Sequence, residues 1–460
     1  MYVAAVLYTP EWAIKQIRKL SLDFIWNNKK YKIKDSYLQR HYVNGGIKLM
    51  DIKTQIMSLK LRWIGRILDE TDGNWKHIPK LQFNKIGGIH LCLNYNLKLD
   101  QLKYINKMSP FYEEIFKAWC MLNNKKEQTC TSQDDILNQV IWYNSYITHA
   151  KKPLFLKEWI KAGIVTVRDI LVKSSFITFL EIQRKLDSAG SRATCFFDLE
   201  KIKMCIKKEW RNMLLNVNLE HYDKIKRNVK VSPSLRVGDK MYQIWELKTK
   251  TFYKILTENN ILESRVEGYW QNKVHNNPIG QSELEWKNVW KFKLKSVRDT
   301  RLNNFNLKFL YNIVPVNSNL YKWNLTESDK CPECNIKEDI LHAFLFCEKL
   351  NTFWRWLENI IHHLQMDYGN FKMSCSVIIY GFNIENKKYN LLNFIVNCAL
   401  FVIYKCIVIR NFEDKKYGYV KLQNMLQQEI KNQIYCDANS KNIRKFFSEG
   451  EIDIVKYHLT

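Results

Sequence analysis

Four residues in the last third of this 460-residue chain constrain its fold most, because their spacing, Cys-x2-Cys-x7-His-x4-Cys, brings them together. They are Cys331, Cys334, His342 and Cys347. Three thiolates and one imidazole suit a tetrahedral Zn²⁺ ion that leaves no position open for water. The spacing therefore predicts one structural zinc ion. Ordinary buried cysteines and a core histidine are the alternative interpretation.

The local structure around these four residues follows from the same spacing. Cys331 and Cys334 would flank a tight turn, and His342 would lie on the helix that the following apolar residues suggest. Residues five apart point in different directions on an α-helix, so Cys347 is expected at or beyond the helix end. A zinc deaminase is excluded by pattern, since its His-x-Glu motif does not precede the cysteine pair.

Apolar residues recur at helical spacing through much of the chain. Ile52, Ile56, Leu59, Trp63 and Ile67 form one stripe, which makes Trp63 a packing residue. Glycine and proline are scarce, at 15 and 8 residues, which disfavours a turn-rich all-β fold. The predicted fold class is mainly α, a multi-helix architecture. An exception is the strand-like aromatic and β-branched content of residues 141–147.

The segment Leu391–Ile409 is apolar enough to be mistaken for a membrane span. It contains Asn393, Asn397 and Lys405, which fall on one side of a helix. A central lysine costs a few kcal/mol in a bilayer. We therefore expect a buried helix with one polar seam, formed by these three residues, and no membrane.

The twelve cysteines are spread over the whole chain and lack the dense pattern of a secreted disulfide scaffold. The apolar start, Tyr2–Tyr8, is short, and positive charges follow it instead of preceding it as in a secretory signal. We expect an intracellular chain with reduced thiols.

The chain is strongly basic. Its 72 Lys+Arg against 46 Asp+Glu give a net charge of +26, which suggests a polyanionic partner, most often nucleic acid. Residues 287–308 hold seven basic residues and a single acid, and a second basic stretch follows residue 200. A solvated basic face is the alternative. The predicted nucleic-acid contacts are Lys287, Lys291, Lys293, Lys295, Arg298, Arg301 and Lys308, and then Lys203, Lys207, Lys208 and Arg211.

Four segments resemble, in order, the C-terminal part of LINE-type non-LTR retrotransposon polyproteins. Residues 331–357, "CPECNIKEDILHAFLFCEKLNTFWRWL", resemble its zinc-binding segment, in which a tryptophan, here Trp354, comes after the cluster. Residues 286–325 resemble the helical run that leads into it. Residues 141–171, with "IWYNSYI" and "KEWIKAGI", resemble its W-x-N and W-x-x-x-G-I segments. Residues 14–68 resemble the reverse transcriptase thumb and the segment directly after the thumb.

The resemblance implies a function and a division of the chain. The region would grip template RNA or target DNA during target-primed reverse transcription, with Arg62 and Arg66 along the thumb helix facing the duplex. The implied partners are RNA or DNA and the remainder of a reverse transcriptase polyprotein, in the nucleus or cytoplasm. The expected parts are a thumb-like helical segment (1–79), a mixed connector with a basic stretch (80–230), a reverse-transcriptase-type zinc-binding domain (231–357), a C-terminal helical region (358–415) and a charged tail (416–460).

The family's polymerase palm has no counterpart in these residues. Its two-metal chemistry needs paired aspartates at a strand–turn–strand, whereas the adjacent pair Asp134–Asp135 lies in a polar stretch that suggests a helix cap. We therefore expect no polymerase activity from this chain alone. The alternatives are a zinc-stabilised protein-interaction module, a vestigial fragment without activity, or a longer product whose upstream sequence supplies the polymerase.

Overall fold

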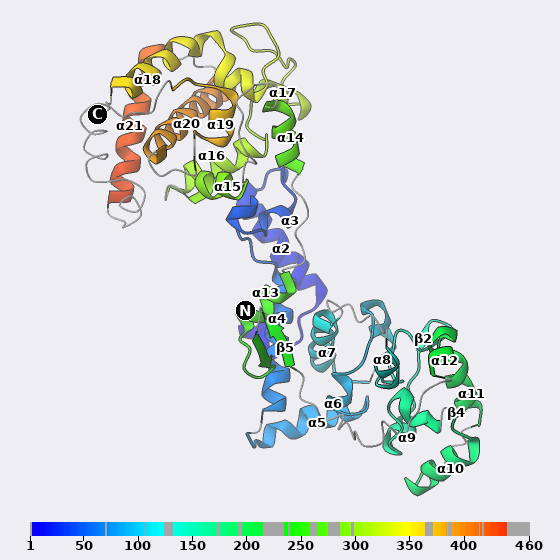
Figure 1. Ribbon diagram of the computed structural model, residues 1–460. Helices are drawn as coiled ribbons and strands as arrows, with labels where there is room; N and C mark the ends of the chain where they lie inside the picture. The colour runs from blue at the N-terminus through cyan, green and yellow to red at the C-terminus, as the bar shows by residue number, and fades with distance from the viewer. Residues whose placement is uncertain are drawn as a thin grey trace. The chain divides into compact units, whose positions relative to one another are not determined.

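The computed structural model describes residues 2–69, 71–105, 107–123, 132–172, 175–191, 196–214, 234–237, 240–257, 265–274, 286–295, 299–363, 371–382, 384, 389–413, 415 and 418–438. Helices predominate, and the described strands form short hairpins, which confirms the mainly α prediction (Figure 1). The chain divides into an N-terminal unit, Met1–Ser21 with Asp51–Ile261, and a C-terminal unit, Leu22–Met50 with Leu262–Thr460. These units cut across the expected segment 1–79, because residues 22–50 pack with the C-terminal part of the chain.

The N-terminal unit contains most of the short helices and the hairpins. Its helices are α1 (Tyr2–Val6), the first part of α2 (Glu11–Trp26), α4 (Ile52–Leu68), η2 (Asn74–Lys76), α5 (His77–Asn84), α6 (Ile89–Cys92), η3 (Leu99–Tyr104), α7 (Pro110–Asn123), α8 (Gln133–Leu137), α9 (Lys157–Lys161), η4 (Val167–Ile170), α10 (Phe179–Ser188), α11 (Phe196–Cys205), α12 (Lys208–Leu214) and α13 (Thr249–Thr257). The antiparallel hairpins pair β1 (Thr148–His149) with β2 (Lys152–Pro153), β3 (Leu171–Val172) with β4 (Ser175–Phe176), and β5 (Ser234–Val237) with β6 (Lys240–Gln243).

Helix α4 is central to this unit and packs against α1, α7 and α13. Ile52, Ile56 and Ile67 of the predicted stripe are buried. Gly65 lets a neighbouring segment approach, because a Cβ there would lie 2.9 Å from Trp245 Cα. Lys60 is fully buried on the same helix and forms an ion pair with Glu114 of α7.

Residues 141–147 are turns, so the strand suggested by their composition is wrong. Tyr143 has a φ of 46°, a left-handed conformation outside the range of a regular strand. Asn144 donates from Nδ2 to Val140 O and accepts from Tyr146 N–H, which closes the turn. The aromatic content reflects burial instead, since the fully buried Trp142 donates from Nε1 to Ile164 O.

The C-terminal unit is built from longer helices around one core. It contains the end of α2, α3 (Asp35–Leu38), η1 (Tyr42–Asn44), α14 (Arg265–Val274), α15 (Trp286–Lys295), α16 (Thr300–Leu310), α17 (Asn317–Lys322), the π-helical turn η6 (His342–Phe346), η7 (Glu348–Leu350), α18 (Asn351–His363), α19 (Cys375–Tyr380), α20 (Asn390–Glu413) and α21 (Tyr419–Ala438).

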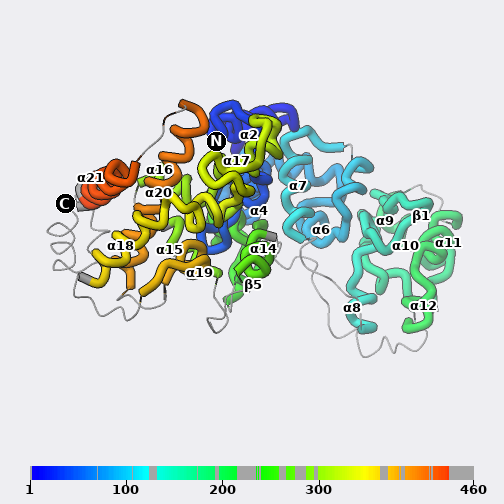
Figure 2. Tube along the Cα trace, turned by 90° about the horizontal axis from the view of Figure 1, so that it is seen from above, coloured from blue at the N-terminus to red at the C-terminus, as the bar shows by residue number. Residues whose placement is uncertain are grey.

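Helix α20 forms the centre of this core, where it contacts α16, α19, η6 and α21 (Figures 1 and 2). Among the described residues, α20 is the one helix that is long and apolar enough to cross a membrane. Of its most apolar 18-residue stretch, 72% is buried inside the structure. Each residue of the polar seam has a polar partner: Asn393 accepts from Phe382 N–H, Asn397 accepts from Lys293, and Lys405 pairs with Glu429. This is the buried helix with a polar seam that the sequence predicts.

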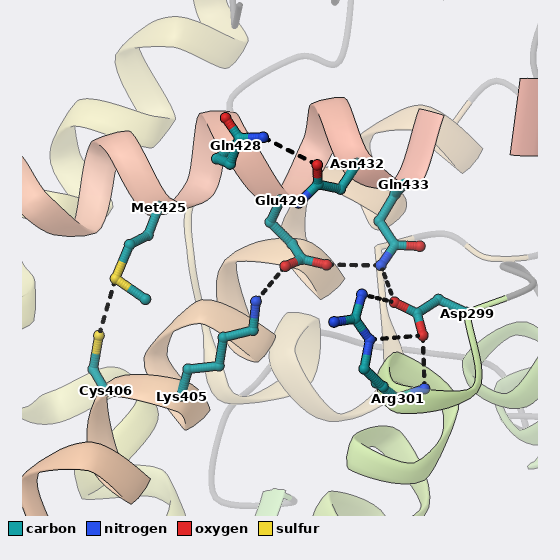
Figure 3. A network of polar contacts seen from close by, with 9 residues as sticks. All are labelled: Asp299, Arg301, Lys405, Cys406, Met425, Gln428, Glu429, Asn432 and Gln433. Carbon is teal, nitrogen blue, oxygen red and sulfur yellow. Dashed lines mark hydrogen bonds and ion pairs between the residues drawn. The ribbon is translucent and has the colours of Figure 1, made fainter. Parts of the chain in front are cut away.

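Helix α21 packs on α20 through an apolar stripe, Leu422, Leu426, Ile430 and Ile434, so this part of the expected charged tail belongs to the core. Figure 3 shows the polar contacts that join the two helices to the start of α16. Gln433 donates to both Glu429 and Asp299, at 2.7 Å each, and Asp299 caps α16. Residues 439–460 lie outside the described residues.

Candidate metal centre

The first two cysteines of the cluster lie on a tight turn. Asn335 N–H donates to Cys331 O at 2.9 Å, and Cys331 N–H donates to Ile336 O at 2.7 Å. Asn335 has a φ of 54°, a left-handed conformation that asparagine tolerates better than most residues. An antiparallel bridge between Lys330 and Lys337 closes the loop. The turn therefore points both thiols to one side, as the Cys-x2-Cys spacing predicts.

The other two ligands flank η6: His342 is its first residue, and Cys347 directly follows it. Cys347 N–H donates to His342 O at 2.8 Å, a hydrogen bond between residues five apart that defines a π-helical turn. In this wider turn, residues five apart face nearly the same way. Cys347 thus lies at the helix end, as predicted, and the π-turn aligns it with His342.

The four side chains meet in one place. Their ligand atoms all lie within 4.8 Å of one another, and Cys334 Sγ lies 3.7 Å from Cys347 Sγ. Two sulfurs bound tetrahedrally to one ion at ~2.3 Å would be about 3.8 Å apart. Both ring nitrogens of His342 are buried and have no hydrogen-bond partner among the described residues, which is costly unless another group satisfies one of them. These residues could therefore hold a metal ion.

Burial raises the pKa of the Cys347 thiol to about 12, and the neighbouring Cys331 and Cys334 contribute to this rise. A metal ligand must be the thiolate, so the positive charge of a bound ion would have to offset the raised pKa.

Asp339 positions His342 through its backbone, and it is not among the site residues predicted from the sequence. It precedes the helical turn, and its Oδ1 accepts from His342 N–H at 2.9 Å, while Lys273 binds Oδ2 at 2.8 Å. Burial alone would raise the pKa of Asp339, but Lys273 and the His342 N–H hold it below its usual value. An aspartate three residues before a helical histidine is a helix-cap signal, so local sequence could have revealed it.

The predicted basic contacts on α15 differ in exposure. Lys287 and Lys291 are exposed, with no acidic partner among the described residues. Lys293 is 1% exposed and donates to Asn397 Oδ1 at 2.6 Å and to Ile378 O at 3.2 Å. The prediction that Lys293 contacts nucleic acid is therefore wrong, because this amine satisfies buried oxygens of α19 and α20. The Lys295 side chain and Arg298 lie outside the described residues.

Burial lowers the pKa of Lys293 to about 7. Between pH 7 and 10 the unfolded chain binds a proton at this amine that the folded chain lacks, so stability should rise with pH. We expect the free energy of unfolding of the wild type, relative to that of Lys293→Met, to rise by up to about 1.4 kcal/mol per pH unit in this range. Urea unfolding at pH 7, 8 and 9 measures it, with the exposed Lys291→Met as control. A difference independent of pH would contradict it.

The last two basic residues of this stretch lie on α16. Arg301 is exposed but folds back on its own helix cap, with Nη2 3.0 Å from Asp299 Oδ2. Lys308 is half-buried, and burial, followed by the proximity of Lys29, lowers its pKa. Both remain on the surface of the C-terminal unit.

The second predicted basic group lies in the N-terminal unit. Lys203 pairs with Glu200 at 2.8 Å, and Lys207 lies over the ring of Tyr146 at 4.5 Å. Lys208 is exposed and Arg211 is half-buried. These four basic residues thus lie on or near α11 and α12. Two of them, Lys203 and Lys207, already contact neighbouring side chains.

Arg62 has a structural role on α4. Its Nη1 donates to Trp245 O at 2.8 Å and Leu247 O at 2.7 Å, which joins α4 to the segment before α13. Arg66 is exposed and lies 5.2 Å from the Trp63 ring. Trp63 is half-buried and donates to Ala5 O, as expected of a packing residue.

Asp134 and Asp135 lie in the first turn of α8, so their interpretation as a helix start is confirmed. Asp135 N–H donates to Ser132 Oγ, and Asp135 Oδ2 accepts from Ser132 N–H, both at 3.1 Å. This reciprocal pair is a capping box.

No protein-family model and no curated protein matches this chain. The fold and the site together define a mainly α-helical protein with a Cys₃His group that could hold a metal ion.

Proposed function

We propose that this chain binds nucleic acid as the C-terminal part of a LINE-type reverse transcriptase, gripping template RNA or target DNA during target-primed reverse transcription. The observation that carries the proposal is the exposed pair Lys287 and Lys291, one turn apart on α15 in a chain of net charge +26. Cations with no acid beside them neutralise phosphates and release counterions. The sequence resemblance supplies the polyprotein context, inside the cell, with the remainder of the polyprotein as partner.

The metal in this proposal is zinc with a structural role. Three soft thiolates and one imidazole favour zinc over Mg²⁺ or Ca²⁺, which prefer oxygen ligands. Four protein ligands would complete a tetrahedral shell, so the ion would join the Cys-x2-Cys turn to η6. In this role zinc shapes the basic domain and takes no part in a reaction.

Lys287→Glu with Lys291→Glu should weaken RNA binding, because two attractive interactions with phosphates become repulsive. The slope of log affinity against log salt is negative, and we expect it to become less steep by about two, one for each phosphate that is no longer neutralised. Fluorescence anisotropy with a labelled RNA across a salt series measures both quantities. Lys161→Glu with Lys415→Glu is the control, since these exposed lysines already pair with Glu158 and Glu413 and the change in net charge is the same.

Two outcomes would contradict the proposal in different ways. Equal losses of affinity in test and control variants would show that net charge, not α15, determines binding. A wild-type chain that binds RNA no better than the weak non-specific level of any basic protein would favour the protein-interaction module or the vestigial fragment.

We also propose that this chain alone has no polymerase activity. Primer extension with Mg²⁺ and deoxynucleotides should give no product, because the paired aspartates serve as a helix cap. Robust extension would refute this part of the proposal.

A further inference from the structure

A lysine-rich loop follows α2 in the C-terminal unit. The helix ends where Asn27 and Asn28 adopt left-handed conformations, with φ of 50° and 57°, and Asn28 N–H donates to Asp23 O at 2.8 Å. Ile33 is 5% exposed and anchors the far end of the loop in the core. The loop is thus held at both ends, while Lys29, Lys30 and Lys34 are exposed and Lys32 is half-buried.

The positive charge of the first of these lysines, Lys29, acts on Lys308 of α16. Lys29 is exposed and Lys308 is half-buried. Burial and then Lys29 lower the pKa of Lys308, and both effects oppose its positive charge. Neither amine has an acidic partner among the described residues. An anion near these two ammonium groups would stabilise the charged form of both.

The same loop brings a cation onto an aromatic ring. Lys32 Nζ lies 3.5 Å from the centre of the Trp323 ring, and both side chains are half-buried. Trp323 follows α17, where its N–H donates to Asn319 O and Leu320 O at 3.1 Å each, so its position is set by the helix end. One face of the ring is therefore covered by a charged side chain and not by apolar packing.

We propose that Lys29, Lys32, Lys308 and Trp323 form a site for single-stranded nucleic acid. A base would stack on Trp323, Lys32 would move from the ring to a phosphate, and the positive charges of Lys29 and Lys308 would attract further phosphates. Lys29 and Lys32 are three residues apart, so their Cα atoms are at most about 11 Å apart, which a few nucleotides can span. This inference rests on the proposed function and adds the ligand class.

The Trp323 ring should give this site a higher affinity for a single strand than for a duplex. In a duplex the base faces are stacked on one another, so a duplex offers phosphates alone to this surface. An unpaired base stacked on an aromatic side chain contributes about 1–3 kcal/mol, whatever its sequence. The lysines would attract either ligand, and Trp323 would favour the single strand.

The test compares a labelled single strand of twelve nucleotides with a duplex of the same length, using the full chain. Trp323→Ala should weaken single-strand binding about 5- to 150-fold and leave duplex binding within about twofold. Trp323→Phe should restore most of the affinity, which a merely structural role of the indole would not predict. Lys29→Glu with Lys308→Glu should lower the salt slope for the single strand by about two.

The variant Lys287→Glu with Lys291→Glu distinguishes the contribution of this site from that of α15. It should lower the affinity for the single strand and for the duplex by the same factor. Unchanged single-strand affinity in Trp323→Ala, or equal loss of affinity for both ligands, would overturn the single-strand site while the proposed function stands. If circular dichroism shows that Trp323→Ala is unfolded, the same comparison of single-strand and duplex affinity is made with Lys32→Met and Trp323→Phe. Failure of the wild-type chain to bind either ligand would overturn both proposals.

Discussion

Replacing Cys331 and Cys334 with serine should abolish metal binding and destabilise the C-terminal unit. The change leaves two of four ligands, and serine hydroxyls are poor replacements for thiolates. A bound ion would join the turn at Cys331 and Cys334 to η6, where His342 and the following Cys347 are buried beside the core. Structural zinc contributes about 10–16 kcal/mol of apparent binding free energy in zinc-finger peptides, although this unit also has an apolar core. We expect the melting temperature to fall by about 10 °C or more.

Elemental analysis of the purified chain measures the first effect, with one zinc per chain expected for wild type and close to none for the variant. Hydrogen exchange of residues 331–350 shows whether the loss of stability is located at the cluster. Cys406→Ala is the control, because this half-buried cysteine contacts Met425 Sδ at 3.9 Å and is not part of the cluster. Equal zinc content and melting temperature in wild type and the double variant would show that the cluster holds no metal.

Lys60→Met should lower the free energy of unfolding of the N-terminal unit by about 3–5 kcal/mol. Lys60 Nζ lies 2.9 Å from Glu114 Oε2, with both side chains buried, and also donates to Leu7 O at 2.5 Å. Burial lowers the pKa of Lys60, and Glu114 opposes that shift by stabilising the ammonium. Removing the lysine would leave a buried carboxylate without its cation.

The double variant Lys60→Met with Glu114→Leu should recover much of this stability, since replacing both charges of a buried pair by apolar groups is often nearly neutral. Urea unfolding followed by hydrogen exchange of peptides from α4 and α7 measures the effect. Lys53→Met serves as control on the same helix, because its ion pair with Glu11 at 3.0 Å is exposed and worth at most about 1 kcal/mol. Equal effects of Lys60→Met and Lys53→Met would contradict the prediction.

Features that depend on neighbours in the sequence could be predicted. The spacing of the four metal ligands, the helix through Ile52 and Ile67, and the helix start at Asp134–Asp135 all rest on residues within a few turns of one another. Their geometry follows from the helical repeat and from helix capping. The position of Cys347 at a helix end was predictable for the same reason, although the π-turn that aligns it with His342 was not.

Side-chain environments set by distant residues could not be predicted. Lys293 lies in the same basic run as Lys287 and Lys291, yet its amine reaches Asn397, more than a hundred residues away in sequence. Residues 141–147 have the composition of a strand, but the pairing that would make them one is absent among the described residues, and the left-handed Tyr143 excludes it.

The sequence by itself determined the helical class of this protein, its excess of positive charge and the residues that could hold a metal, because these follow from composition and short-range spacing. Only the tertiary structure decided which lysines face solvent, which satisfy buried oxygens and which meet an aromatic ring. A lysine's role depends on the atoms that surround its amine, since burial and neighbouring charges alter the free energy of its charged form by several kcal/mol. Those atoms come from distant parts of the chain, as Lys293 with Asn397 and Lys32 with Trp323 show.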